Sequence, residues 1–187
     1  MRKKDKIIGT IVMLFMLAVD HLTKYWAIVS LKGQEPIKVW QNVFHFVYAE
    51  NRGAAFSMLQ NKRIFLILFT AAAIILVLWM IYFDKFKFNR AASIGLCLIA
   101  SGGIGNLIDR IFRAYVVDFI YFVPINFPVF NVADACVTIG TIIFAIGFMV
   151  DEFRAAKSAK LSAAAETSVS EEVPQESSLP TSETEDR

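Results

Sequence analysis

Two aspartates stand in apolar surroundings within a short stretch of this sequence. Asp118 lies in VVDFI, and Asp134 lies in FNVADACV at the start of a run that continues almost without charge. Ionisable side chains at or near a bilayer are costly and need partners or water. Each acid also has a structural interpretation. Asp118 could be a loop acid, and Asn131 with Asp134 resembles the capping box of a helix.

Taken together, the two aspartates have the chemistry of a peptidase. Two carboxylates held close together cannot both ionise, so one of them keeps a proton near neutral pH. The ionised member can take a proton from water, and the protonated member can polarise the carbonyl group of a peptide bond. The helix dipole stabilises a negative charge in the first turn of a helix. It therefore favours Asp134 as the ionised partner of Asp118.

A glycine-rich stretch, GGIGNLIDR, carries a second set of polar residues. Gly102, Asn106 and Arg110 are spaced four apart, which places them on one face of a helix. The glycines would let a neighbouring helix or a ligand approach closely, next to the polar groups of Asn106 and Arg110. The alternative is a glycine packing seam whose arginine extends to water. The spacing supports both interpretations equally.

A third motif, VDHLTK, supplies Asp20 and Lys24 in the favourable order for an ion pair within a helix. We interpret this pair as structural support. A serine hydrolase that uses Lys24 as its base is an alternative, although no serine has a spacing that recommends it. The two histidines, His21 and His45, form neither an HExxH motif nor a cluster with cysteine. The sequence therefore predicts no metal site and no cofactor.

Four apolar runs must position these residues. They cover residues 7–28, 64–83, 91–111 and 132–150, and 56% of the 187 residues are hydrophobic. Each run has about the 20 residues that a helix needs to cross a bilayer. The first run could also be a cleaved signal peptide, but no small-x-small cleavage site follows Ala18. The fold class predicted is an α-helical membrane protein with four transmembrane helices.

The basic residues indicate how these helices are oriented. RKKDK, DKFKFNR and FRAAKSAK flank the spans on one side, which the positive-inside rule assigns to the cytoplasm. Both termini are then cytoplasmic, and the loops 29–62 and 112–131 face outward. The basic excess follows the membrane, so no nucleic-acid partner is expected. We assign residues 1–161 to the transmembrane domain, and residues 162–187 to a disordered, acidic cytoplasmic tail because they are rich in Ser, Thr, Glu and Pro.

The outer loops carry signals of their own. Residues 39–49 are rich in Val, Phe and Tyr and alternate partly, which predicts a small β-element on the membrane surface. Pro124 and Pro128 exclude a regular helix from the second loop.

The polar motifs, in this order, closely resemble those of bacterial lipoprotein signal peptidase, also called signal peptidase II. The matching segments are DHLTK from Asp20, NRGAAFS from Asn51, GNLIDR from Gly105, VVDFI around Asp118 and FNVADA around Asp134. The resemblance covers about residues 5–155. It implies four transmembrane helices with an extracytoplasmic β-cradle, in the bacterial cytoplasmic membrane. We expect a monomer surrounded by membrane lipids.

The resemblance also implies an activity. The protein would be an aspartic endopeptidase that cuts prolipoproteins just before a cysteine carrying a diacylglyceryl group, and the peptide antibiotic globomycin would block it. The family's catalytic pair falls on Asp118 and Asp134. The family's other polar positions fall on residues that would hold the substrate backbone, namely Asn51, Asn106, Arg110 and Asn131. Asp20 and Lys24 match positions of support.

Two other functions fit a small membrane protein with buried acids. A proton-coupled transporter would use the acids as a relay, but it predicts polar residues through several spans, and the second span carries no charge. A scaffold protein would tolerate the loss of the Asp118 carboxylate with effects on stability alone.

Overall fold

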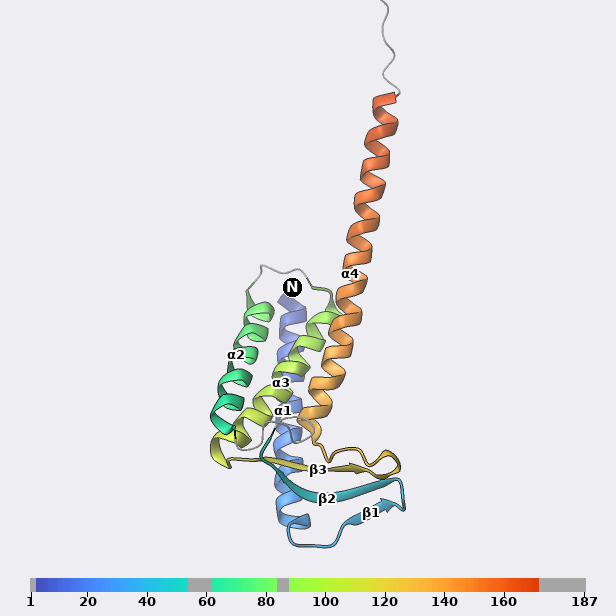
Figure 1. Cartoon of the computed structure of the whole chain (residues 1–187). Coiled ribbons are helices and arrows are strands. Elements are labelled where there is room, and N and C mark those ends of the chain that lie inside the picture. The colour runs from blue at the N-terminus through green and yellow to red at the C-terminus, as the bar shows by residue number, and fades with distance from the viewer. Residues whose placement is uncertain (1–2, 54–61, 84–87, 172–187) are drawn as a thin grey trace, which may run out of the picture. The chain divides into compact units, whose positions relative to one another are not determined.

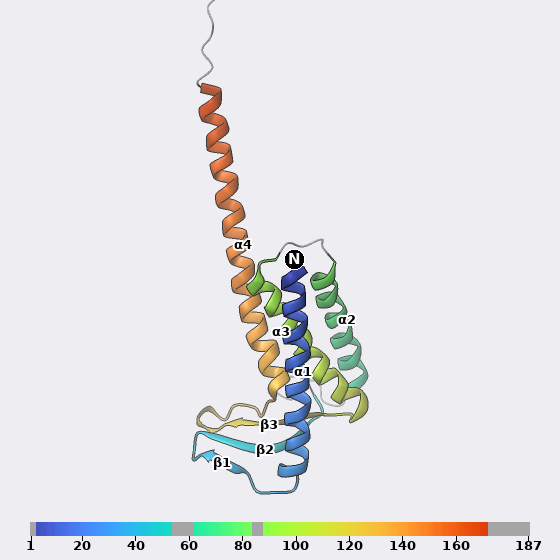
Figure 2. The same ribbon diagram turned by 180° about the vertical axis from the view of Figure 1, so that it is seen from behind.

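The computed structural model describes residues 3–53, 62–83 and 88–171, with side chains up to residue 162. Within these ranges four helices are long and apolar enough to cross a membrane. They are α1 (Lys3–Leu31), α2 (Arg63–Tyr82), α3 (Arg90–Phe112) and α4 (Val132–Glu171). Figures 1 and 2 show the first three helices and the first part of α4 side by side. The predicted four-span fold is confirmed.

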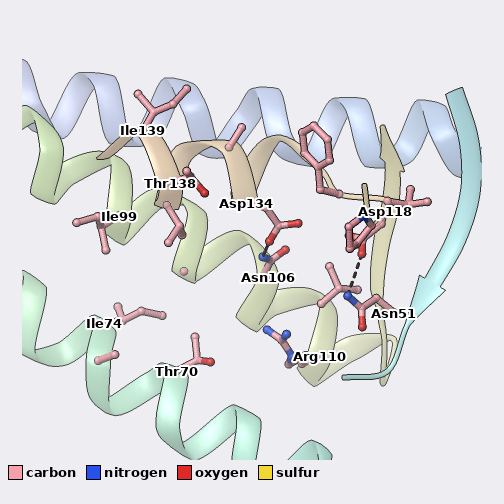
Figure 3. Close-up of a pocket in the computed structure, with 18 of the residues that line it drawn as sticks. Asn51, Thr70, Ile74, Ile99, Asn106, Arg110, Asp118, Asp134, Thr138 and Ile139 are labelled. Atoms are coloured by element: carbon pink, nitrogen blue, oxygen red, sulfur yellow. Dashed lines mark hydrogen bonds between the residues drawn. The ribbon is translucent and has the colours of Figure 1, made fainter. Parts of the chain in front are cut away.

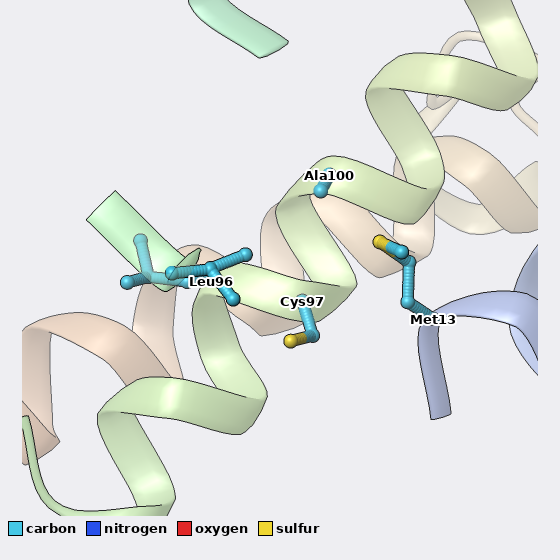
Figure 4. Packing of buried hydrophobic residues seen from close by; sticks show 5 residues of the cluster. Met13, Leu96, Cys97 and Ala100 are labelled. Atoms are coloured by element: carbon cyan, nitrogen blue, oxygen red, sulfur yellow. The ribbon is translucent and has the colours of Figure 1, made fainter. Parts of the chain in front are cut away.

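Helix α3 lies at the centre of the bundle and carries the largest buried share of the four helices. Its side chains Leu96, Cys97 and Ala100 form a core cluster with Met13 of α1 and Ile81 of α2 (Figure 4). Lipid is as apolar as these side chains, so close van der Waals packing holds such helices together. The central position of α3 explains why its polar residues are shielded from lipid.

Glycines allow α3 and α4 to approach until their backbones touch. A Cβ atom on Gly95 would lie 2.7 Å from the carbonyl oxygen of Gly140, and a Cβ atom on Gly140 would lie 2.7 Å from that of Gly95. A Cβ atom on Gly102 would overlap the carbonyl oxygen of Ala133. The glycine seam that we weighed as the structural interpretation of Gly102 is therefore present, and it brings α3 against the first turn of α4.

A three-stranded antiparallel sheet lies at the end of the bundle where α3 ends and α4 begins (Figure 2). Its order is β1 (Ile37–Trp40), β2 (Phe44–Asn51) and β3 (Val116–Phe122). The predicted β-element at 39–49 is confirmed as parts of β1 and β2. Strand β3 was not predicted, although VVDFIYF has the β-branched and aromatic composition of a strand. The chain after it forms only a short 3-10 helix (Val123–Ile125), as its prolines require.

Aromatic contacts fix the sheet to α1. Trp26 makes edge-to-face contacts with Phe46 of β2 at 5.2 Å and with Phe119 of β3 at 6.1 Å between ring centroids. Next to these rings, Ala27 and Leu31 pack against Val117. Edge-to-face aromatic pairs are favourable beyond the apolar area that they bury. The sheet is thus held against α1, and with it the strand that contains Asp118.

The chain forms two compact units, Met1–Met149 and Val150–Arg187. The domain boundary after residue 161 stays a prediction. Composition predicts disorder from residue 162, whereas α4 continues to Glu171. The run LSAAAE explains the difference, because alanine has the highest helix propensity. Residues 172–187 lie outside the described residues.

The glycine seam generates a stability prediction. Gly102→Ala places a methyl group against the backbone of Ala133, so α3 and α4 must separate. We expect a loss of about 1–3 kcal/mol, the usual cost of overpacking, measured as a lower melting temperature of the purified protein in detergent. Gly103→Ala is the matched control, because its methyl group meets only the Ile74 side chain, at 3.0 Å. Equal melting temperatures for the two variants would contradict the seam.

Candidate active site

A cavity of about 870 Å³ opens between the sheet and helices α2, α3 and α4. Its polar end is lined by Asn51, Asn106, Arg110, Asp118 and Asp134 (Figure 3). Its remaining wall is mostly apolar and comes from α2, α3 and α4, from residues 127–130 before α4, and from the neighbouring strands. The fold therefore brings both aspartates, predicted as a pair from the sequence, to the wall of one cavity.

Asp118 is held in place by the β2–β3 pairing. It lies opposite Ala49 in the sheet, and its side chain is 2% exposed. Each carboxylate oxygen accepts a hydrogen bond from an amide side chain. Asn51 donates to Oδ2 at 3.0 Å, and Asn131 donates to Oδ1 at 2.6 Å. The two amide groups fix the rotation of the carboxylate.

Asp134 lies in the first turn of α4 and forms the predicted capping box with Asn131. The Asp134 backbone N–H donates to Asn131 Oδ1 at 2.9 Å, and the Asn131 backbone N–H donates to Asp134 Oδ2 at 3.2 Å. Such reciprocal bonds satisfy two N–H groups that a helix start would otherwise leave unpaired. Capping and participation in the cavity therefore coexist in this residue.

Two asparagine side chains join the aspartates. Asn106 donates from Nδ2 to Asp134 Oδ1 at 2.8 Å (Figure 3). Its Oδ1 accepts a bond from Asn131 Nδ2 at 3.2 Å, and the same Nδ2 reaches Asp118. Asn131 is fully buried and does not line the cavity, whereas Asn106 does. Asn131 thus contacts both carboxyl groups from behind the cavity wall.

The surroundings of Asp118 favour its protonated form. Burial, and after it the negative charge of Asp134, raise the pKa of Asp118 to about 7, although hydrogen bonds from Asn51 and Asn131 and the charge of Lys24 act to lower it. Near neutral pH the pair therefore has one proton available at Asp118. That Asp134 is the ionised partner stays a prediction.

Lys24 and Asp20 form the predicted ion pair, with 2.9 Å between Nζ and Oδ2, and both are 1% exposed. Lys24 also contacts Asp109 Oδ2 at 3.1 Å and donates to Asn106 Oδ1 at 2.9 Å. No role was predicted for Asp109. Its position offered one signal, because an acid three residues after Asn106 in an apolar helix lies on the same side of that helix, the side that faces α1.

Arg110 is half-buried on the cavity wall and donates to the backbone carbonyl of Gly53 at 3.0 Å. The backbone N–H of Gly53 donates in turn to Asn51 Oδ1 at 2.9 Å. This arrangement connects the end of α3 to the end of β2. The later part of the NRGAAFS motif, residues 54–57, lies outside the described residues.

The serine alternative gains no support from the described contacts. The Ser101 hydroxyl donates to the backbone carbonyl of Met13 at 3.0 Å, and Lys24 is engaged by Asp20, Asp109 and Asn106. Ser57 lies outside the described residues.

Comparisons with known proteins identify relatives of this chain. A family model described as signal peptidase (SPase) II matches residues 12–150. The chain is 44% identical to the lipoprotein signal peptidase of Clostridium tetani over 145 residues, which are 76% of this chain and 92% of the relative. It is 36% identical to that of Streptococcus thermophilus strain CNRZ 1066 over 138 residues, covering 74% and 90% of the two chains.

The fold is similar to that of solved structures. A bacterial membrane enzyme determined by the in meso method at 2.3 Å resolution superimposes with a TM-score of 0.70 at 27% identity, covering 78% of this chain and 89% of the other. A second, determined at 1.9 Å resolution, gives a TM-score of 0.68 at 28% identity, covering 75% and 92%.

The raised pKa of Asp118 predicts how stability depends on pH. The folded value of about 7 exceeds the ordinary 3.8, so the folded protein binds more protons between these pH values and loses stability as pH rises through them. Asp118→Asn cannot ionise. We therefore expect its melting temperature, relative to that of the parent, to increase between pH 5 and pH 8. A change in melting temperature that comes from the altered hydrogen bonds alone would be the same at every pH.

The matched control is Glu35→Gln, which removes an exposed carboxylate before β1. A melting-temperature difference between Asp118→Asn and the parent that stays constant across this pH range would contradict the prediction.

Proposed function

The chain belongs to the signal peptidase II family, and we propose that it removes the signal peptide from prolipoproteins by the mechanism of an aspartic endopeptidase. It is a multi-pass membrane protein and a protease of the signal peptidase class. The observation that carries the proposed mechanism is the pair of buried aspartates on one cavity wall, joined through Asn106 and Asn131. Membership in a peptidase family leaves the transporter and scaffold alternatives without support.

In the proposed reaction a water molecule attacks the carbonyl carbon of the scissile peptide bond. Asp134 takes a proton from that water, and protonated Asp118 donates a hydrogen bond to the carbonyl oxygen as negative charge develops there. When the tetrahedral intermediate collapses, the carbon–nitrogen bond breaks and the proton on Asp134 passes to the leaving amine. Asp118 ends the cycle with its own proton. The unequal surroundings of the two acids support these separate roles.

The lining of the cavity supports the proposal that the substrate is partly peptide and partly apolar. Figure 3 shows Ile74 of α2, Ile99 of α3 and Ile139 of α4 on the cavity wall away from the sheet. A signal peptide is itself an apolar membrane segment, and an acylated cysteine adds lipid chains. We propose that cleavage occurs just before a diacylglyceryl-modified cysteine.

Polar residues at the other end of the cavity are placed to hold the peptide backbone. We assign this role to Asn51 and Arg110, which line the cavity beside the aspartates, and to Asn106 through its amide group. Asn131 has no surface in the cavity, so we assign it to orientation of the carboxylates.

The distribution of charged and apolar residues supports an orientation in the membrane. We propose that both termini are cytoplasmic, that the protein lies in the bacterial cytoplasmic membrane, and that the cavity opens near the outer face. Exposed Phe15 of α1 and Phe69 of α2 would contact membrane lipids. Exposed Trp40 of β1 suits the membrane–water interface. We expect a monomer.

The mechanism is tested by removal of either carboxylate. Asp118→Asn and Asp134→Asn keep the side-chain shape, and we expect each to lower the cleavage rate of a lipidated prolipoprotein by about 10²-fold or more, because general acid–base catalysis is lost. Membranes that contain each variant are assayed by gel shift of the precursor, with Glu35→Gln as control. Normal cleavage by either folded variant would exclude the aspartic mechanism. Normal cleavage by the parent in the presence of globomycin would count against the proposed inhibitor.

The mechanism also predicts a pH profile. The pair needs one proton, so kcat/KM should fall as pH rises through about 7, where Asp118 loses its proton. The apparent pKa belongs to the pair as a unit. Initial rates of the purified protein between pH 5 and pH 9, with substrate at concentrations well below KM, measure the profile. A rate that is constant up to pH 9 would contradict the need for a protonated Asp118.

A further inference from the structure

The ammonium group of Lys24 has three N–H donors, and three oxygen atoms lie within 3.1 Å of its nitrogen. They are Asp20 Oδ2 at 2.9 Å, Asn106 Oδ1 at 2.9 Å and Asp109 Oδ2 at 3.1 Å. Lys24, Asp20 and Asp109 are each 1% exposed. A buried charge is tolerated only when it is paired and its hydrogen bonds are satisfied. Each of the three residues that supply these oxygen atoms also makes a hydrogen bond to Asp134 itself or to the backbone N–H of the residue that precedes Asp118 or Asp134.

The first contact runs through Asn106 to Asp134. Lys24 donates to the amide oxygen of Asn106, which leaves the Nδ2 atom on the other side of the amide plane. That atom donates to Asp134 Oδ1 at 2.8 Å. The positive charge at Lys24 therefore selects one of the two orientations of the Asn106 amide, namely the one in which it donates to the carboxylate.

The second contact runs through Asp109 to β3. Asp109 Oδ2 accepts the backbone N–H of Val117 at 3.2 Å in addition to Lys24. Val117 directly precedes Asp118, and its own side chain is fully buried. The bond thus fixes β3 to α3 at the residue adjacent to the carboxylate.

The third contact runs through Asp20 to the start of α4. Asp20 Oδ1 accepts the backbone N–H of Ala133 at 2.9 Å, and Ala133 directly precedes Asp134. Gly105 leaves space for this approach, because a Cβ atom there would lie 2.5 Å from Asp20 Oδ2. Helix α1 therefore helps to cap α4 beside the second carboxylate.

We propose that Lys24 is a positioning residue that sets the placement of Asp118 and Asp134 relative to each other, acting through Asp109, Asn106 and Asp20. The inference rests on the proposed function, because it assigns a role toward that same pair. Lys24 does not touch the substrate. It fixes three elements, β3, α3 and α4, around one buried charge, so that the two carboxylates on separate elements keep a constant geometry.

The contrasting interpretation is a clamp that only holds α1 against α3. The same two helices provide a matched example of such a clamp at their other end. Asp5 of α1, 2% exposed, pairs with Arg90 of α3 at 2.9 Å. Figure 1 shows the start of α1 at the end of the bundle that lies away from the sheet. Loss of Asp5 weakens the contact between α1 and α3 without touching the aspartate pair.

The experiment compares Lys24→Met, Asp109→Asn and Asp5→Asn, purified in detergent and assayed on a lipidated prolipoprotein. We expect the first two variants to lower kcat by about tenfold or more with KM within about twofold, since small misplacement of catalytic groups has a large effect on rate. Asp5→Asn should lower the melting temperature but leave kcat within about twofold. Asp109→Asn keeps the side-chain shape, so it tests the proposal even where Lys24→Met does not fold.

A kcat within twofold of the parent for folded Lys24→Met or Asp109→Asn would overturn the proposal. The proposal would also be overturned if Asp5→Asn and Asp109→Asn lost the same amount of kcat at the same loss of melting temperature. A clamp between α1 and α3 would then be enough to explain the effect of Asp109→Asn. Asp118→Asn and Asp134→Asn, assayed in parallel, separate this outcome from failure of the proposed function. If those two variants are inactive while Lys24→Met is normal, only the positioning role fails.

Discussion

A charge buried between apolar helices is stable only when it is paired, and Lys24, in the polar interior of this protein, meets that constraint. Its Nζ atom lies within 3.1 Å of three oxygen atoms, which belong to residues of α1 and α3. Removing one partner of a buried pair is far more costly than burying the complete set. The polar residues can therefore persist between apolar helices only as a connected group. This requirement explains why residues far apart in the sequence lie together.

The same constraint accounts for the glycines of α3. Polar side chains on a central helix reach their partners only if the neighbouring backbones come close. Gly102 brings α3 against Ala133 at the start of α4, and Gly105 admits the carboxylate of Asp20. The packing seam and the polar group are thus two consequences of one close approach. The close packing of this stretch is confirmed, and its role toward a ligand stays a prediction.

The sequence predicted the parts of the structure that depend on local pattern. Span length located the four helices, and the spacing of Asn131 and Asp134 predicted their capping box. It did not predict β3, because Asp118 interrupts the apolar pattern of that strand. The role of Asp109 was missed for a related reason. Its partners, Lys24 and Val117, come from other elements, and only tertiary packing brings them together.

The fold makes the two aspartates unequal by placing them on different kinds of element. Asp134 lies in the first turn of a helix, where its Oδ2 atom accepts the backbone N–H of Asn131. Asp118 lies within a strand, and burial there favours its protonated form. The two carboxyl groups thereby meet different surroundings. This difference fits the separate roles that we propose for them in water-mediated hydrolysis.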